Sequence, residues 1–559
     1  MMTKIKTFFV TYGWTICALI VSSATLLCWF ASLGDGDYFF NSDALYLPSL
    51  YRDIFQDGYT LNGWTLNPAP NIFPDMLLFF PLNAIFGDFI TAIFGFAFIQ
   101  YFAYIFILYL IFKNLKPNLH PSTFVPAIFL FSSYLFIDNA GFQSALLNLN
   151  SYHNGAFIMG LLCVYLFIKY FNTKSQKILI VVLILSMLSG ACDKLFFIYF
   201  SIPVSLVIIV LYFFNKDWKT LTRFLVTIAL GTILAIVLWR FFMNNSYFSL
   251  SEAYGNITLW YIEHSWSVFS QQMYGYLTSH SFAIVLTYFS LFSYVVVVIY
   301  VFRKTLKLIR EKKHADVLFA FQLFVLFFVP IVLFAPILSG SYDNPYSLRY
   351  NYFPYILLPF NSVVLLGNWL NKNKLVRIIL NTTLSLLMAG YLFFNFTVQE
   401  LKSGLNHFFT FYPEKVRIID DYFLDDNTLK YGITNDYWTA KQTTMFSKKG
   451  VRLYSAWNWG EPWLHVSNKY WFIDHDKGKH AHCEFTFLLW EKETEVPEIF
   501  KKMNDSLQAV ELGNFYLYEV NPYRFIIPGS QFGIEPVLIL DNMIRDERKS
   551  YELKYGNFN

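Results

Sequence analysis

Seven aspartates lie between Asp35 and Asp88, and Arg52 is the single Lys or Arg among them. Asp37 and Asp43 closely follow a long apolar run, where a carboxylate at the edge of a membrane would experience a reduced dielectric constant. Such surroundings shift the pKa of a carboxylate and suit it to general-base catalysis. Asp43 and Asp37 are therefore candidate catalytic bases, and the alternative is that these aspartates are ordinary loop charges and helix caps.

Metal chemistry has one candidate site in the sequence. The Asp35-Gly-Asp37 pattern could hold a divalent cation that is bound to phosphate oxygens. The five cysteines show neither a zinc-binding spacing nor a disulfide framework, and we expect no other metal or cofactor.

Three further positions place a polar group beside apolar sequence. Asp193 and Lys194 interrupt an apolar stretch, where ionisable residues are unfavourable and usually functional. Lys194 could contact a phosphate, or the pair could neutralise itself across two helix ends. Arg349 could clamp a phosphate through its bidentate fork. His153 begins an apolar run and could hydrogen-bond a sugar or a phosphate, although a lone histidine there is more often structural.

The chain is 56% hydrophobic and 14% charged, whereas soluble domains are about 25% charged. A membrane span needs about 20 apolar residues. The sequence predicts an α-helical polytopic membrane protein with about 11 transmembrane helices. The expected spans are 9–32, 89–112, 122–138, 154–171, 178–192, 194–214, 223–243, 281–302, 316–337, 350–370 and 378–398.

Lys and Arg accumulate in alternate loops between these spans. The remaining loops, 33–88, 139–153, 244–280 and 338–349, are nearly free of them. Because cytoplasmic loops carry the excess of Lys and Arg, we expect the N-terminus in the cytoplasm and the C-terminus on the outer side. The expected location is the cell inner (cytoplasmic) membrane.

The predicted organisation is a membrane domain at 1–398, with a long first outer loop at 33–88, followed by an extracytoplasmic α/β domain at 399–559. Strand-like runs in the second domain alternate with helical stretches such as Val496–Leu507. The runs are Val416–Ile419, Lys430–Ile433, Val451–Tyr454, Phe485–Leu489 and Asn514–Val520. Several tryptophans there could stack on sugar rings or simply fill a core.

Residues 43–58 of the first loop have the apolar spacing of a helix. That pattern predicts an amphipathic helix at the membrane interface. Ser42 or Asp43 would be its N-cap, where the helix dipole also favours a carboxylate.

The order and spacing of residues in this loop resemble the first periplasmic loop of GT-C class membrane glycosyltransferases. The similar branch contains the protein O-mannosyltransferases and the lipid A aminoarabinose transferases. The matching residues are Asp43-Ala-Leu-Tyr46, Arg52-Asp53-Ile54, Asp57-Gly58, Asn67-Pro-Ala-Pro70 and Phe86-Gly-Asp88. Two departures are visible: the acidic pair of the family is Ser42-Asp43 here, and its Lys before the prolines is Asn67. Looser matches are Asp193-Lys194 and Arg349-Tyr350.

The resemblance implies an enzyme, an inverting glycosyltransferase with a polyprenyl-phosphate-linked sugar donor. The acceptor would be a glycolipid, a polysaccharide or a protein, and the other partner would be the lipid bilayer, with no nucleic acid. Asp43 would act as general base, with Asp37 as its competitor. Substrate would contact Arg349, Lys194, Tyr46, His153, Arg52 and Tyr350.

Three other readings stay open. A transporter or flippase of lipid-linked glycans would show inverted repeats or paired broken helices, and none is detected. An O-antigen polymerase-like enzyme would favour a large central outer loop. A non-catalytic membrane scaffold would leave the acidic first loop unexplained.

Overall fold

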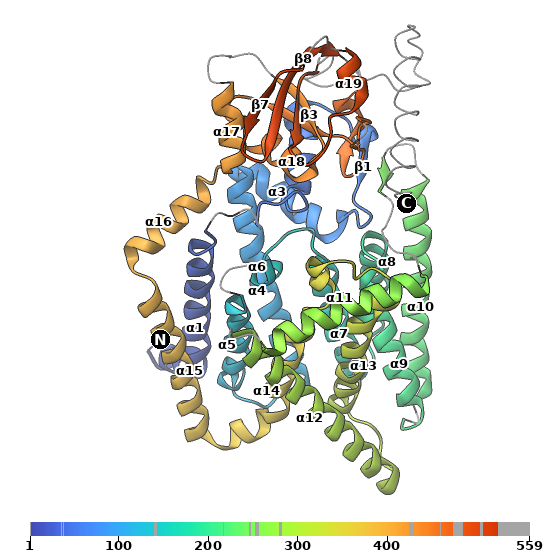
Figure 1. Cartoon of the computed structure of the whole chain (residues 1–559). Coiled ribbons are helices and arrows are strands. Elements are labelled where there is room, and N and C mark those ends of the chain that lie inside the picture. The colour runs from blue at the N-terminus through green and yellow to red at the C-terminus, as the bar shows by residue number, and fades with distance from the viewer. Residues whose placement is uncertain are drawn as a thin grey trace. The chain divides into compact units, whose positions relative to one another are not determined.

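The structure is a computed structural model of the chain. It describes residues 2–34, 36, 39–138, 142–215, 217–244, 248–251, 257–278, 282–423, 430–458, 460–472, 485–503 and 507–523. The chain divides into two compact units (Figure 1). Unit 1 comprises Met1–Gly34, Asn71–Phe241 and Ala253–Phe409, and unit 2 comprises Asp35–Pro70, Phe242–Glu252 and Thr410–Asn559.

Unit 1 is built from helices. The longer ones are α1 (Met2–Ala31), α3 (Leu77–Phe86), α4 (Phe89–Leu115), α5 (Val125–Ser133), α7 (Asn154–Thr173), α8 (Gln176–Cys192), α9 (Ile202–Tyr212), α10 (Trp218–Met243), α11 (Leu259–Thr278), α12 (Phe282–Glu311), α13 (Val317–Leu338), α14 (Pro354–Lys372), α15 (Lys374–Asn395) and α16 (Val398–Phe409). Shorter turns connect them, namely η3 (Ile72–Met76), η4 (Pro121–Thr123), η5 (Tyr134–Phe136), α6 (Phe142–Leu146), η6 (Phe197–Ser201) and η7 (Pro345–Tyr350).

Seven helices in the described part of the chain are long and apolar enough to cross a membrane. They are α1, α4, α7, α10, α12, α13 and α15. Four shorter apolar helices lie at Ile72–Phe86, Pro121–Phe136, Gln176–Cys192 and Phe197–Tyr212. A mostly helical membrane protein is therefore confirmed, whereas the number of spans and their orientation stay predictions.

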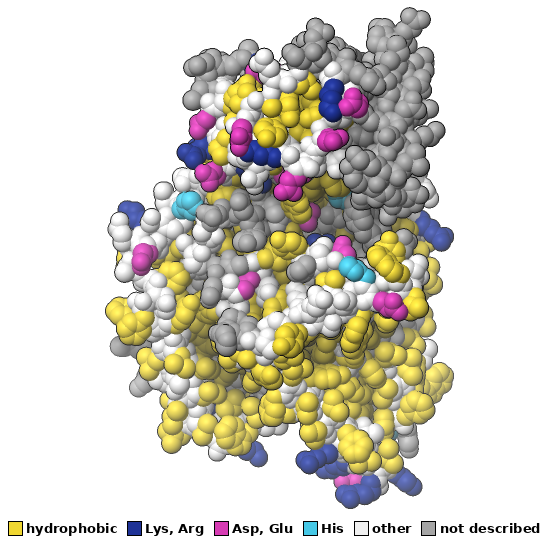
Figure 2. All heavy atoms as spheres, in the orientation of Figure 1, with side chains coloured by type: hydrophobic (Ala, Val, Ile, Leu, Met, Phe, Trp, Pro, Cys, Tyr) yellow, Lys and Arg dark blue, Asp and Glu magenta, His cyan; other side chains and the backbone are white. Residues whose placement is uncertain are grey.

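The outer surface of unit 1 explains why its helices suit a lipid environment. Hydrophobic side chains cover this face of the helices, and Lys and Arg gather at the end of α12 (Figure 2). Along α12, Phe292 and Phe302 are 65% and 63% exposed, whereas Ser290 and Ser293 are buried. Because large apolar patches are uncommon on soluble monomers, this arrangement is typical of a helix that faces lipid.

Unit 2 contains a five-stranded sheet with the strand order β4-β3-β6-β8-β7. Its strands are β3 (Tyr431–Thr434), β4 (Arg452–Ser455), β6 (Phe485–Glu491), β7 (Ala509–Leu512) and β8 (Phe515–Tyr523). β3 pairs in parallel with β4 and β6, and β8 runs antiparallel to β6 and β7. The sheet is accompanied by α17 (Glu414–Tyr422), α18 (Tyr437–Phe446) and α19 (Glu498–Met503).

Four of the five predicted strands in this unit are confirmed, and the helical prediction at 496–507 overlaps α19. The strand predicted at Val416–Ile419 is wrong, because these residues belong to α17. Val416 and Ile419 are both buried while Arg417 between them is exposed. A spacing of three residues places side chains on one face of a helix, not of a strand.

The first acidic loop contributes its residues 35–70 to unit 2. It forms α2 (Tyr46–Arg52), continues as the π-helical turn η1 (Asp53–Asp57), and ends at Gly58 with φ 77°. Farther on, β1 (Trp64–Leu66) pairs with β2 (Ser249–Leu250) and β5 (Ser467–Asn468). The sheet formed by β1, β2 and β5 joins three segments that are distant in the sequence.

The predicted helix in this loop is present but its predicted cap is wrong. Leu45, and not Ser42 or Asp43, occupies the N-cap. The Asn41 side chain accepts hydrogen bonds from the backbone N–H groups of Asp43 and Ala44 and fixes the approach to the helix. Residues 46–50 are all buried, so the helix packs within the protein.

Candidate functional site

Helix α18 carries Tyr437 and Lys441, which contact Ser42, the residue before Asp43. Asp436 caps this helix, since its carboxylate accepts from the N–H groups of Trp438 and Thr439. One helical turn then places Lys441 beside Tyr437. The Lys441 ammonium donates to the Tyr437 hydroxyl at 3.0 Å and to the Ser42 carbonyl at 3.4 Å. The Ser42 contact brings this lysine to the residue that precedes Asp43.

The electrostatics of this group connect Asp43, Lys441 and His465. Burial lowers the pKa of Lys441 to about 7, while the charge of Asp43 acts in the opposite direction and raises it. Burial, followed by the charge of Lys441, lowers the pKa of His465 to about 4, and Asp43 again opposes the shift. Asp43 is thus the carboxylate that interacts with both basic groups. A lysine with this pKa changes between its charged and neutral forms close to neutral pH.

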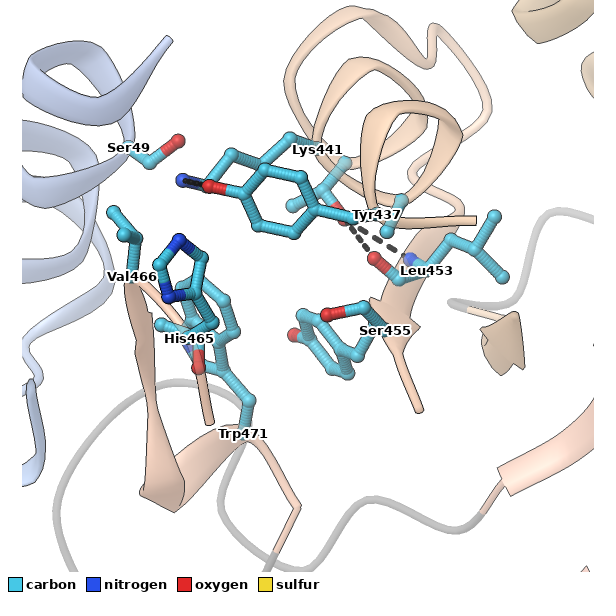
Figure 3. Close-up of a pocket in the computed structure, with 12 residues that line it drawn as sticks. Ser49, Tyr437, Lys441, Leu453, Ser455, His465, Val466 and Trp471 are labelled. Atoms are coloured by element: carbon cyan, nitrogen blue, oxygen red, sulfur yellow. Dashed lines mark hydrogen bonds between the residues drawn. The ribbon is translucent and has the colours of Figure 1, made fainter. Parts of the chain in front are cut away.

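Lys441, His465 and Tyr437 line a small cavity (Figure 3). Its volume of about 10 Å³ is close to the minimum that holds one water molecule. The sticks in Figure 3 show the Lys441 amine, the Tyr437 hydroxyl and the His465 ring facing the same space. A sugar does not fit in this volume, so the cavity would have to open before a substrate could reach these groups.

Arg52, a predicted substrate contact, belongs to a buried charge network. Its Nη1 donates to the Thr444 carbonyl at 2.6 Å, and its Nε lies 3.5 Å from Asp57 Oδ2. The Arg452 guanidinium lies 3.2 Å from the same Asp57 oxygen. Burial, then the charge of Arg452, lowers the pKa of Arg52, and Asp57 partly restores it. The Thr444 contact gives Arg52 a role in joining the first loop to α18, while Arg452 joins Asp57 of this loop to β4.

Asp53 lies beside this network and is also buried. Its Oδ2 accepts from Asn468 Nδ2 at 3.0 Å and from Trp471 Nε1 at 2.8 Å. Burial raises the pKa of Asp53 to about 7, although both hydrogen bonds act to lower it. Trp471 is itself buried, which favours a packing role for this tryptophan over sugar stacking.

Two other residues of the first loop were proposed as site residues. Tyr46 is completely buried, and its hydroxyl donates to the Pro70 carbonyl at 3.0 Å. Asp37, the competing base, and Asp35, its partner in the possible cation site, both lie outside the described residues. Groups of three or more His, Cys, Asp or Glu that could hold a metal ion are absent among the residues that the structure describes.

In unit 1 the structure brings together three predicted substrate contacts. His153 precedes α7 with φ 64°, and its Nδ1 lies 2.7 Å from Asp193 Oδ2. The Tyr350 ring lies 5.3 Å from the His153 ring. The Arg349 Nη2 donates to the Tyr350 hydroxyl at 3.2 Å. His153, Arg349 and Tyr350 therefore form one cluster with Asp193.

Lys194 takes a different position from this cluster. Its ammonium lies 3.8 Å from the centre of the Trp239 ring, while Asp193 pairs with His153. The two neighbouring charges therefore have separate partners in this part of the chain. A cation over an indole face is stabilised by the ring quadrupole.

Sequence reasoning missed several residues of these two groups. Lys441 and His465 gave no signal, because their burial beside Asp43 depends on the packing of segments that are nearly 400 positions apart. Asp75 was counted among the acidic residues without a role. A Cβ added at Gly155 would lie 2.4 Å from Asp75 Oδ1, so this carboxylate rests against the first turn of α7.

No family model and no curated protein matches this chain. Among solved structures, the chain is similar to the crystal structure of the Archaeoglobus fulgidus oligosaccharyltransferase complex with Zn and sulfate. The identity is 11% and the TM-score is 0.38, over 91% of this chain and 73% of the other. A TM-score of this size is too low to transfer the role of any residue.

Proposed function

We propose that this protein is a glycosyltransferase that moves a sugar from a polyprenyl-phosphate-linked donor to an acceptor on the outer face of the cytoplasmic membrane. The observation that carries the proposal is the position of the buried Lys441, whose ammonium donates to the carbonyl of Ser42, the residue before Asp43. Asp43 is the residue that the first-loop pattern assigns as base.

In the proposed reaction, Asp43 takes the proton from an acceptor hydroxyl as the hydroxyl oxygen attacks the anomeric carbon. A new carbon–oxygen bond forms to the acceptor. The bond to the donor phosphate breaks, and the phosphate leaves with the bonding electrons. Attack opposite the leaving group inverts the anomeric configuration. Lys441 would then act as a positioning residue through its hydrogen bond to the Ser42 carbonyl, next to Asp43.

The leaving phosphate needs positive charge or hydrogen-bond donors. Arg349, with Tyr350 and His153 in the same cluster, offers such groups in unit 1. Lys194 is a second cation for this role. Fixed cations aimed at a developing negative charge contribute strongly to such catalysis, and we propose this role for Arg349 and Lys194.

The proposal is tested by comparing the masses of envelope glycolipids and glycoproteins from four strains of cells. One strain carries the wild-type protein, one lacks the protein, and the other two carry Asp43→Asn or the control Asp88→Asn. Asp88 caps α4 through its side chain, and Asn is an equally good N-cap. Deletion and Asp43→Asn should both remove one sugar increment, with transfer about 10²–10⁴-fold slower in the variant. The control Asp88→Asn should retain it.

Other outcomes would redirect the assignment. Full transfer by Asp43→Asn would remove Asp43 from the mechanism and make Asp37→Asn the next variant to examine. If deletion changed no glycan mass, glycosyl transfer would be rejected in favour of a transporter or a scaffold.

A further inference from the structure

Unit 1 contains a second cavity that no motif in the sequence indicated. Its volume is about 620 Å³, within the range of about 300–1,000 Å³ that is usual for small-molecule sites. Its lining comes from the residues around α6, from α11 with the first residues of α12, and from the segment before η7. Most of this lining falls within the loops at 139–153, 244–280 and 338–349, which are poor in Lys and Arg and are predicted to face the outer side. Ile137, Asp138 and Ala283 belong to the adjoining predicted spans.

The described lining of this cavity combines apolar and polar side chains and carries no Lys or Arg. It includes two carboxylates, Asp138 and Asp343, together with the amides of Gln143, Gln271 and Asn344. Both carboxylates already accept hydrogen bonds from the protein. Asp138 accepts from the backbone N–H groups of Gln143 and Ser144, and Asp343 Oδ1 accepts from the Ser347 hydroxyl at 2.8 Å. A negatively charged ligand would be repelled by this lining.

We propose that this cavity binds a neutral, hydroxyl-rich ligand, that is, a carbohydrate. Each sugar hydroxyl both donates and accepts, which matches a wall of carboxylates and amides. The hydrocarbon face of a sugar can pack on the apolar part of the lining, which includes Ile137 and Val268. A bare divalent cation is less suited, because protein donors already occupy oxygens of both carboxylates. The inference deepens the proposed function, on which it rests for the role of the sugar as a substrate.

The test measures binding by the whole protein in lipid nanodiscs prepared without alkyl-glycoside detergent. Saturation-transfer-difference NMR follows the methyl glycosides of glucose, galactose, mannose and arabinose. Methyl glucuronoside serves as the anionic counterpart of methyl glucoside. At least one neutral glycoside should bind, and the glucuronoside should bind more weakly than the glucoside.

Two variants link binding to the cavity. Gln143→Leu and Gln271→Leu each replace an amide of the lining with an apolar group, and Gln271 is an exposed residue of α11 that should tolerate substitution. Each should weaken binding about 2- to 10-fold, the effect of one lost hydrogen bond. The control Gln176→Leu, at an exposed position on α8 outside the lining, should bind as the wild type does.

The proposal is overturned if no neutral glycoside binds, if the glucuronoside binds better than the glucoside, or if both cavity variants bind normally. Saturation by Ca²⁺ with displacement of the sugar would overturn it as well. Asp43→Asn separates the two proposals, since it should retain sugar binding while it loses transfer. Normal transfer by Asp43→Asn together with weakened binding by Gln143→Leu would reject the proposed base and retain the cavity.

Discussion

The two units bury their polar side chains in different ways. Unit 2 buries charges in contact with one another, such as Asp57 with Arg452, each with 6% of its side chain exposed. Unit 1 relies largely on neutral pairs such as Gln322 with Asn361, and the contact of His153 with the Asp193 carboxylate is an exception. Ionised groups are unfavourable within a membrane, whereas the interior of a folded globular domain tolerates them once they are paired.

This difference shows what holds each unit together. In unit 2 the paired charges join the acidic first loop to a sheet formed about 400 residues later. In unit 1 the apolar faces of successive helices pack with aromatic contacts, such as Phe157 with Phe353 at 4.1 Å. Changes to buried charges in unit 2 should therefore have larger effects than changes to polar pairs in unit 1.

The largest effect is expected for Arg452→Met, which removes the guanidinium group that lies 3.2 Å from the buried Asp57 carboxylate. Breaking a buried ion pair by removing one partner destabilises by about 3–5 kcal/mol. Hydrogen exchange followed by mass spectrometry on peptides of unit 2 should show the loss as faster exchange across β4. The matched control is Arg417→Met, whose partner Glu414 lies 3.5 Å away in an exposed pair. It should cost less than about 1 kcal/mol, and an equal loss in both variants would contradict the comparison.

A second expectation concerns pH. The folded protein releases the Lys441 proton near pH 7, whereas the unfolded chain holds it until about pH 10.4. Between these values the unfolded state binds more protons, so the free energy of unfolding should rise with pH. The slope should approach about 1.4 kcal/mol per pH unit.

Asp53 and His465 also change the free energy of unfolding with pH, but they do so below about pH 7. The raised pKa of Asp53 lowers stability as pH rises from about 4 to 7, while the depressed pKa of His465 raises stability from about 4 to 6.5. The contributions of Asp53 and His465 oppose each other below pH 7. The rise in stability above pH 7 is therefore assigned to Lys441. Lys441→Met should remove the alkaline rise, measured by hydrogen exchange of α18 at several pH values, and Lys492→Met at a more exposed pair should keep it. A rise that persisted in Lys441→Met would contradict the assignment.

In unit 1, Gly155→Ala should have an intermediate effect. The added Cβ would lie 2.4 Å from Asp75 Oδ1 and 2.8 Å from Pro74 Cδ. Such overpacking typically costs about 1–3 kcal/mol, measurable as a lower thermal midpoint in nanodiscs. The control Gly390→Ala places its Cβ in open space within α15 and should stabilise by up to about 1 kcal/mol. A lower midpoint for the control, or none for Gly155→Ala, would refute this account of the packing.

The smallest effect is expected for the neutral amide pair between α13 and α14. Gln322 and Asn361 exchange two hydrogen bonds, at 2.6 and 3.0 Å. A double-mutant cycle with Gln322→Leu and Asn361→Leu should give a coupling energy of about 0.6 kcal/mol, the average for polar pairs within membranes. The measurement is thermal unfolding of the four proteins in nanodiscs. A coupling as large as that of Arg452 with Asp57 would remove the contrast between the units.

Much of unit 1 could be predicted because a helix that faces lipid is recognised from the apolar residues of its own segment alone. Runs of about 20 apolar residues identify spans such as α4 and α12 without any knowledge of their neighbours. Helices such as α8 and α9 are shorter, so composition alone could not decide the number of spans. The strand predicted at Val416–Ile419 failed because four residues are too few to separate a period of two from one of 3.6.

The sequence by itself determined the membrane class of the protein, most strands of unit 2 and the acidic loop that contains Asp43. Only the tertiary structure decided which charges surround that loop, since Lys441 and Arg452 come from the far end of the chain. It also decided that His153 meets Asp193 and Tyr350, and that three separate segments of the chain line a cavity of about 620 Å³. The physical reason is the separation of the interacting residues along the chain. An apolar pattern is set by residues that are close in sequence, whereas the pairing of buried charges depends on residues that are close only in space.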